Sequence, residues 1–148
     1  MSKTIKYSLA AFLVAIVIGI AYGLFIYFEP VKDIATQKTD IKLTDKQILA
    51  EFNENNLFAD SLYKNKIIEI TGNVKKTEIN DSTYNVVIDD GGNYIIIASC
   101  VEETKSKLAL QKEGNTITLK GIYNGYVIND ETFMIPAEIK IDRCTVLK

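Results

Sequence analysis

The sequence predicts a mainly β domain, a small five-stranded barrel preceded by an α-helix, behind an N-terminal transmembrane helix. Three observations support this prediction. An uncharged segment of 21 residues, Ser8–Phe28, lies near the start of the chain. After Asn65, apolar and polar residues alternate with a period of two, which is typical of strands with one buried face. One short helical segment interrupts the predicted strands between the third and the fourth.

The segment 8–28 is long enough to cross a bilayer, because a helix of this length rises about 31 Å. Lys3 and Lys6 precede it, so residues 1–7 are expected in the cytoplasm. We therefore expect a single-pass protein of the inner or plasma membrane with an extracytoplasmic, periplasmic-facing C-terminal domain. A cleaved secretory signal is the alternative, with Ala21-Tyr22-Gly23 as cleavage site. The apolar run continues beyond that site, which favours an uncleaved anchor.

Small residues recur at every fourth position of the anchor, at Ala11, Ala15, Gly19 and Gly23. Such a stripe lets a second helix approach closely, which is how membrane helices associate. It predicts a homodimer through the transmembrane helix, or pairing with another subunit. The alternative interpretation is that small residues are simply frequent in spanning helices.

Residues 29–43 show no apolar periodicity and are expected to form a linker, so that the domain spans residues 44–148. Thr44-Asp45-Lys46-Gln47 fits a capping box, the signature of a helix N-terminus. Apolar residues at approximately helical spacing then predict a helix over residues 45–62, and they are Ile48, Leu49, Phe52, Ala59 and Leu62.

The alternating pattern predicts five strands, over residues 66–76, 84–88, 94–101, 116–123 and 137–147. Asp89-Asp90-Gly91-Gly92 contains Asp-Gly, a strong hairpin signal, and residues 102–112 predict a short helix. In the last strand the inward phase shifts before Cys144, which predicts a bulge at Asp142-Arg143.

This element order is that of a five-stranded OB barrel. Closing such a barrel pairs the third strand with the fifth, which places Cys100 and Cys144 on neighbouring strands. In an oxidising compartment the two cysteines would form a disulfide. The alternative is two buried thiols, since free cysteine commonly packs as a small apolar residue.

Several motifs resemble the tRNA-anticodon-like OB-fold family of bacterial envelope proteins, over roughly residues 49–147. They are Ala59-x-x-x-Tyr63-x-x-Lys66, Ile68-x-Ile70-Thr71-Gly72-x-Val74, Cys100, Gly114-Asn115-x-Ile117-x-Leu119-x-Gly121, Gly121-x-x-x-Gly125-Tyr126 and Ile141-x-x-Cys144. The resemblance implies an OB fold and an exported or membrane-anchored protein. It does not imply RNA binding, because these motifs are structural glycines and strand patterns.

Two features depart from the family pattern. Relatives often carry a cysteine inside the Gly-x-x-x-Gly motif, where this chain has Tyr123, so a disulfide scheme through that position does not apply. The stretch 127–136 is longer than the usual connection. In OB folds this loop borders the binding face, so specificity is expected there.

Aromatic side chains on the predicted strands are candidates for a ligand-stacking platform, as in OB domains that bind single strands. They are Tyr84, Tyr94, Tyr123, Tyr126 and Phe133. The alternative is that these rings lie in the core or pair across strands.

Charge and composition argue against several functions. Without Lys3 and Lys6, 15 of the 17 basic residues remain against 19 acidic ones, a net charge of −4, so no field attracts a phosphate backbone. Arg143 is the only arginine, and the chain has no histidine. Asp81, Asp89 and Asp90 suit turns better than a calcium site, because no twelve-residue ligand loop is present.

No nucleophile with a partner base is recognisable, so we expect no enzyme, no cofactor and no metal site. The sequence therefore predicts a membrane-anchored binding or scaffolding module that engages an envelope protein or glycan. The alternative is a domain that binds single-stranded nucleic acid or oligonucleotides, which the acidic charge makes less favourable.

Overall fold

The computed structural model describes residues 3–27, 33–128 and 135–147, with side chains from residue 12 onward. The chain divides into two compact units, Met1–Lys32 and Asp33–Lys148. In the first unit, α1 (Lys3–Tyr27) is one helix of 25 residues, and its described side chains, 12–27, are exposed. Within the described residues, no helix is long and apolar enough to cross a membrane.

The second unit is the β domain, and its strands follow from the alternation in the sequence. In β2, for example, Ile68, Ile70 and Val74 are buried while the residues between them are not. The elements in chain order are β1 (Ile41–Thr44), α2 (Asp45–Tyr63), β2 (Ile67–Ile79), β3 (Tyr84–Ile88), β4 (Tyr94–Cys100), the 3₁₀ turn η1 (Glu102–Thr104), α3 (Lys105–Ala109), β5 (Thr116–Val127) and β6 (Ala137–Val146).

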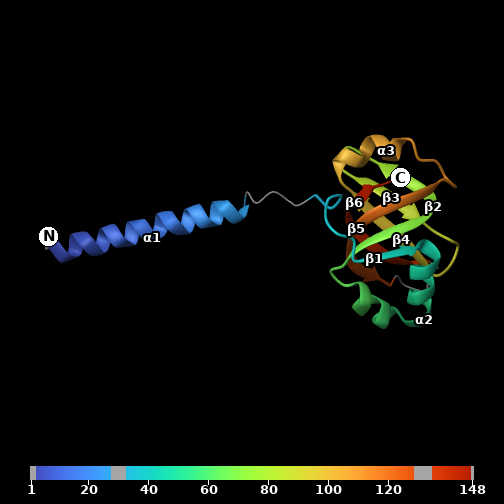
Figure 1. Ribbon diagram of the computed structural model, residues 1–148, viewed down its shortest axis with the longest axis horizontal. Coiled ribbons are helices and arrows are strands. Elements are labelled where there is room, and N and C mark those ends of the chain that lie inside the picture. The colour runs from blue at the N-terminus through green and yellow to red at the C-terminus, as the bar shows by residue number, and fades with distance from the viewer. Residues whose placement is uncertain (1–2, 28–32, 129–134, 148) are drawn as a thin grey trace. The chain divides into compact units, whose positions relative to one another are not determined.

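Five strands form a closed barrel in the order β2-β3-β4-β6-β5, and β5 pairs back onto β2 (Figure 1). The pair β4–β6 is parallel and the other barrel pairs are antiparallel. This is the strand order that the sequence predicts, and it confirms the mainly β, OB-type barrel with a helix before it. The third and fifth barrel strands are neighbours, and Cys100 faces Cys144 in the register.

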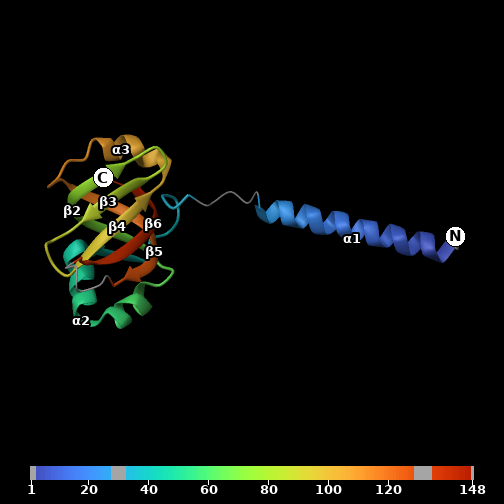
Figure 2. The ribbon, with the colours of Figure 1, turned by 180° about the vertical axis from the view of Figure 1, so that it is seen from behind.

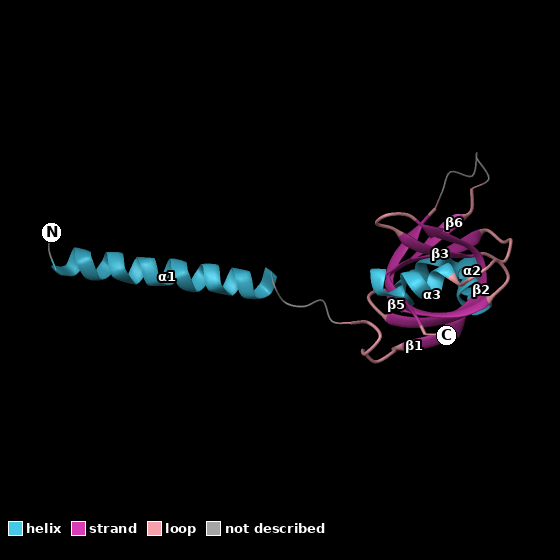
Figure 3. Cartoon of the chain, turned by 90° about the horizontal axis from the view of Figure 1, so that it is seen from above, coloured by secondary structure: helices cyan, strands magenta, loops and turns pink. Residues whose placement is uncertain are grey.

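The two helices of the domain cover opposite ends of the barrel, with α3 at the top and α2 at the bottom in Figure 2, and seen from above both fall within the ring of strands (Figure 3). At one end α3 inserts Leu108, which is fully buried. At the other end α2 inserts Ile48, Leu49 and Phe52. Burying these side chains removes apolar surface from water, which is the main favourable contribution to folding. The helices therefore complete a core that the strands alone leave open.

The start of α2 confirms the predicted capping box. The Thr44 hydroxyl accepts a hydrogen bond from the Gln47 N–H (3.3 Å), and the Gln47 side chain accepts one from the Thr44 N–H (2.8 Å). The helix is interrupted at Asn55, whose backbone is not helical (φ −156°, ψ 94°). The interruption changes which positions of the second half of α2 face the barrel. Tyr63 is therefore buried, and Leu62, which the sequence periodicity predicts to be buried, is exposed.

Residues 33–44 differ from the predicted linker, because they are packed onto the barrel. Ile34 is buried, and β1 runs parallel to the first half of β2 in the register Ile41↔Ile68. The Asp40 N–H donates to the Ile67 carbonyl at 2.8 Å, and the Ile67 N–H donates to the Asp40 carboxylate at 2.9 Å. We call residues 33–44 the strap. It covers an edge of β2 that would otherwise present unpaired backbone groups.

The predicted bulge in the last strand is confirmed. Between the pairs Ile122↔Asp142 and Lys120↔Thr145, β6 carries one residue more than β5. Arg143 occupies this extra position with φ 52°, a left-handed conformation. The bulge restores the inward phase, so that both Ile141 and Cys144 are buried.

Gly121 lies where β5 crosses closest to this bulge. A Cβ at residue 121 would lie 2.5 Å from Ile141 Cγ2 and 3.0 Å from the Asp142 carbonyl oxygen. We expect Gly121→Ala to lower the free energy of unfolding by about 1–3 kcal/mol, the usual cost of overpacking a core. Urea denaturation of the full chain in detergent would measure this. Gly92→Ala, in an exposed turn beside a flexible carboxylate, is the control, and an equal midpoint for the two variants would contradict the prediction.

Candidate binding face on the barrel wall

Three of the five predicted stacking rings lie inside the barrel. Tyr84, Tyr94 and Tyr123 are buried, and Tyr123 is only 1% exposed. Tyr126 is half-buried against the core, and Phe133 lies outside the described residues. The prediction of a stacking platform is therefore wrong for the buried rings, because they occupy inward positions of β3, β4 and β5 and have no free face for a base.

Tyr94, Tyr123 and Tyr126 belong, with Tyr63 of α2, to an aromatic cluster around Phe52, whereas Tyr84 is not part of it. The Phe52 ring centroid lies 5.4–6.3 Å from those of four tyrosines, which are Tyr63, Tyr94, Tyr123 and Tyr126. Aromatic pairs at such distances add to the stability gained from burial alone. The cluster joins α2 to the barrel end, so its rings have a structural role.

The hydroxyl groups of the cluster are bonded to α2. The Tyr123 hydroxyl donates to the Asp60 carboxylate at 2.6 Å, and the Tyr63 hydroxyl donates to Glu51. Burial, and secondarily these carboxylates, raises the pKa of Tyr63 and that of Tyr123 well above the ordinary tyrosine value. Both phenols therefore remain protonated donors at physiological pH and offer no catalytic base.

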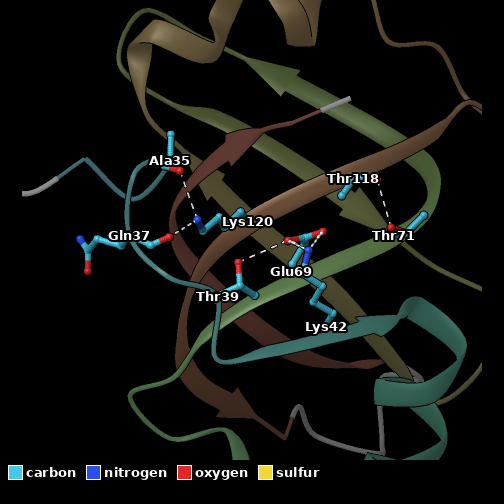
Figure 4. A network of polar contacts seen from close by, with 8 residues as sticks. All are labelled: Ala35, Gln37, Thr39, Lys42, Glu69, Thr71, Thr118 and Lys120. Atoms are coloured by element: carbon cyan, nitrogen blue, oxygen red, sulfur yellow. Dashed lines mark hydrogen bonds and ion pairs between the residues drawn. The ribbon is translucent and has the colours of Figure 1, made fainter.

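The wall formed by β2 and β5 is covered by the strap (Figure 4). Lys120 points out of the barrel, as the alternation predicts, but it is only 6% exposed. Its Nζ donates to the carbonyl of Ala35 at 3.2 Å and to that of Gln37. Thr39 donates to the Glu69 carboxylate at 3.3 Å, and Lys42 forms an ion pair with Glu69 at 3.0 Å. The part of this wall around Lys120 and Glu69 is therefore not free to bind a ligand.

The opposite wall, formed by the outward residues of β3, β4 and β6, has no such cover among the described residues. Cross-strand pairs give its composition: Asn85↔Ser99, Val87↔Ile97, Ile97↔Lys140 and Ile95↔Glu138. Its centre is aliphatic, with Lys140 and Glu138 beside it, and no outward position of these three strands is aromatic. We call these outward residues of β3, β4 and β6 the β3–β4 face. OB folds bind ligands on the corresponding strands.

One polar atom on this face has no partner. The side-chain oxygen of Asn85 is buried and accepts no hydrogen bond from the described residues. Buried polar atoms are nearly always satisfied, so an unpaired acceptor indicates a missing donor. A ligand or water N–H or O–H group could supply it.

Two loops border the β3–β4 face. The turn between β2 and β3 is tight, with the Asn80 N–H donating to the Thr83 carbonyl at 2.9 Å. Of the connection between β5 and β6, residues 129–134 lie outside the described residues. The predicted specificity of the long loop over residues 127–136 therefore stays a prediction.

The predicted cysteine pair is joined. Cys100 and Cys144 form a disulfide between β4 and β6, with their Cα atoms 4.1 Å apart. Cys144 is fully buried and Cys100 is partly buried. Neither sulfur is therefore a free thiol nucleophile.

The acidic residues near the β3–β4 turn have local backbone partners. Asp89 accepts from the Gly91 N–H at 2.7 Å, and Asp90 accepts from the Gly92 N–H at 3.0 Å. These are the bonds that aspartate makes in turns. In the part of the chain that the structure describes, no group of three or more His, Cys, Asp or Glu residues could hold a metal ion.

On α1, the small-residue stripe is open where it is described. A Cβ added at Gly19 or at Gly23 would meet no atom within 4 Å. Ala15 is exposed, and the side chain of Ala11 lies outside the described residues. Helix pairing through this stripe stays a prediction.

The comparisons with known proteins agree with the barrel topology. A family model described as tRNA_anti-like matches residues 1–136. The chain belongs to this family. The comparison with curated proteins finds no match. The family assignment confirms the resemblance predicted from the strand motifs.

Among solved structures, this tRNA_anti-like chain is similar to a "putative nucleic acid-binding lipoprotein" from Klebsiella pneumoniae. The TM-score is 0.55 at 18% identity, covering 81% of this chain and all of the other. An asparaginyl-tRNA synthetase from Pyrococcus horikoshii has a TM-score of 0.43 at 18% identity, over 72% of this chain and 23% of the synthetase. The S. pombe Stn1–Ten1 complex has a TM-score of 0.38 at 15% identity, over 55% of this chain and 58% of the other. At these identities the first similarity shows the shared fold alone.

Proposed function

We propose that this chain is a membrane-anchored binding module whose OB-fold domain lies outside the cytoplasm and binds a protein of the cell envelope through the β3–β4 face. The anchor in this proposal is the uncharged segment 8–28, with its flanking Lys3 and Lys6 on the cytoplasmic side. The domain carries no recognisable catalytic group, and its role is binding or scaffolding.

The disulfide supports the extracytoplasmic location. Disulfides persist in oxidising compartments such as the periplasm and the cell surface, and they are rare in the cytosol. Cys100 and Cys144 lie in register on neighbouring strands, so the fold brings them together as it forms. An exported domain would keep this bond oxidised.

The observation that carries the choice of ligand is the composition of the β3–β4 face. Its centre is aliphatic, and charges of both signs lie beside it. Protein interfaces combine an apolar centre with a polar rim. Single-stranded nucleic acid instead requires rings for base stacking and a positively charged groove. The outward residues of these strands provide neither aromatic rings nor a positively charged groove. Because the face has no aromatic rings, a glycan is also less favoured than a protein as the ligand.

Site-specific photocrosslinking would test the proposal in membranes that contain the full chain. A photoreactive amino acid at Ile97 is expected to capture an envelope protein, and one at the exposed Leu110, directly after α3, is expected to capture none. Lys140→Glu, which reverses a charge beside Ile97, is expected to weaken the adduct. Equal capture from both positions, or an adduct insensitive to Lys140→Glu, would contradict the proposal.

Nucleic acid binding is the second candidate, favoured by the similarity to the Klebsiella protein, which is described as nucleic acid-binding. Titrating the full chain with labelled single-stranded DNA and RNA at low salt distinguishes the two candidates. We expect no saturable binding. Tight binding that weakens with added salt, as counterion release requires, would replace the envelope protein with an oligonucleotide as the ligand.

A further inference from the structure

The second half of α2, after the interruption at Asn55, exposes a group of large apolar side chains. Leu57 is 74% exposed, Phe58 is 64% exposed and Leu62 is 41% exposed. Phe58 and Leu62, four residues apart, share one side of the helix and Leu57 adjoins Phe58, while Ala59 and Tyr63 are buried against the barrel. Large apolar side chains gathered on one helix face indicate an interaction surface. We call Leu57, Phe58 and Leu62 the α2 patch.

The α2 patch is followed directly by basic residues. Lys64 and Lys66 are both exposed, and neither is in an ion pair among the described residues. The nearby carboxylates Glu51 and Asp60 are instead held by the hydroxyl groups of Tyr63 and Tyr123. An apolar helix face next to free lysines is the arrangement that binds the interface of an anionic bilayer.

The strap contacts the chain just after the end of α2. Lys66 immediately precedes Ile67, whose backbone exchanges two hydrogen bonds with Asp40 of the strap. The helical rise puts Phe58 only about 8 Å from Tyr63 along the axis. The α2 patch and the two lysines therefore lie along one stretch of chain that ends where Asp40 of the strap is bonded.

The strap also shortens the connection to the anchor. The sequence alone suggests a 15-residue linker over residues 29–43, but the packed domain begins at Asp33. Only residues 28–32 separate it from the end of α1 at Tyr27. Even fully extended, this connection spans on the order of 20 Å, which is less than the thickness of a bilayer. If the chain is anchored as proposed, so short a connection limits how far the domain can move from the membrane.

We propose that the α2 patch docks onto the membrane, with Leu57, Phe58 and Leu62 inserted at the boundary of headgroups and acyl chains, and with Lys64 and Lys66 at the phosphates of anionic lipids. This inference rests on the proposed membrane anchor and goes beyond it, because it gives the OB domain a fixed lipid-facing side. The bilayer is favoured over a second copy of the chain because two such patches would bring like-charged lysines together.

The absence of tryptophan from the chain provides a clean test. Phe58→Trp introduces one tryptophan into the α2 patch, and Leu110→Trp introduces one at a 76% exposed position of the α3 end as the matched control. Each full-length variant is reconstituted into vesicles of phosphatidylglycerol with brominated acyl chains. We expect the Phe58→Trp emission to shift to shorter wavelength and to lose most of its intensity, while the Leu110→Trp emission stays unquenched. Adding Lys64→Glu and Lys66→Glu to the first variant is expected to restore much of the emission.

The outcomes separate this inference from the proposed function. Vesicle flotation reports the anchor: a chain that does not float with the vesicles overturns both. A chain that floats, but whose Phe58→Trp emission matches that of Leu110→Trp, overturns docking alone. A blue-shifted emission that brominated lipid does not quench, and that depends on protein concentration, would assign the patch to a second copy and overturn docking to lipid.

Discussion

Phe52→Ala is expected to lower the free energy of unfolding by about 3–5 kcal/mol, the usual cost of truncating a buried aromatic side chain. The Phe52 ring is 1% exposed and contacts four tyrosine rings from α2, β4 and β5. Its removal leaves a cavity where the helix meets the barrel end. Rigid ring neighbours cannot collapse into this space easily, so we expect the upper part of the range.

Urea denaturation of the full chain in detergent would measure the effect as a shift of the midpoint at constant slope. Leu110→Ala is the control, because exposed side chains outside special structural features change stability by no more than about 0.5 kcal/mol. A Phe52→Ala midpoint within error of the control would show that α2 does not close the barrel core. A reduced slope would instead indicate that α2 detaches before the barrel unfolds.

The parts of the fold that the sequence predicts are those with a strict local pattern. Thr44 and Gln47 lie at capping-box spacing, and the structure contains both of the expected hydrogen bonds. The phase change before Cys144 locates the bulge at Arg143, because a period of two allows no other way to bury residues on both sides. Such signals depend only on residues close in sequence, so they can be recognised without knowing the tertiary structure.

The strap shows where local patterns fail. Residues 33–40 are mostly polar and have no period, so they resemble a linker. Lys120 occupies an outward position of its strand, which predicts a solvated side chain. In the structure, backbone carbonyls of the strap accept hydrogen bonds from the Lys120 ammonium group, so each provides the other with a polar partner. The bonded residues are 85 and 83 positions apart in the sequence. Neither local pattern therefore contains a sign of these contacts.

For its three buried tyrosines, the stacking-platform prediction failed for a reason that the sequence already contained. Tyr84, Tyr94 and Tyr123 are in phase with Val86, Ile96 and Leu119, which are buried. The phase of the alternation therefore placed these rings inside. The composition of the β3–β4 face could be read in the same way from the intervening residues. Only the pairing of β4 with β6, which is set by barrel closure, was needed to assemble it.

Loss of the Cys100–Cys144 disulfide is expected to lower the free energy of unfolding by about 4 kcal/mol. The chain-entropy relation gives this value for a loop closed over a sequence separation of 44. The bond joins two parallel strands beside the bulge, where the hydrogen-bond register is interrupted. It therefore fixes the β4–β6 pair at a point where its register shifts.

The native chain and the double variant Cys100→Ala, Cys144→Ala should each be unfolded in urea, with and without a thiol reductant. We expect the reductant to lower the midpoint of the native chain and to leave that of the double variant unchanged. A native midpoint insensitive to reductant, after mass spectrometry confirms the reduced thiols, would contradict the prediction. Alkylation of the cysteines in intact cells tests the topology, because the disulfide of an exported domain would protect both cysteines from thiol reagents until it is reduced. Free thiols in the cellular protein would place the domain on the reducing side of the membrane and remove the main support for an envelope partner.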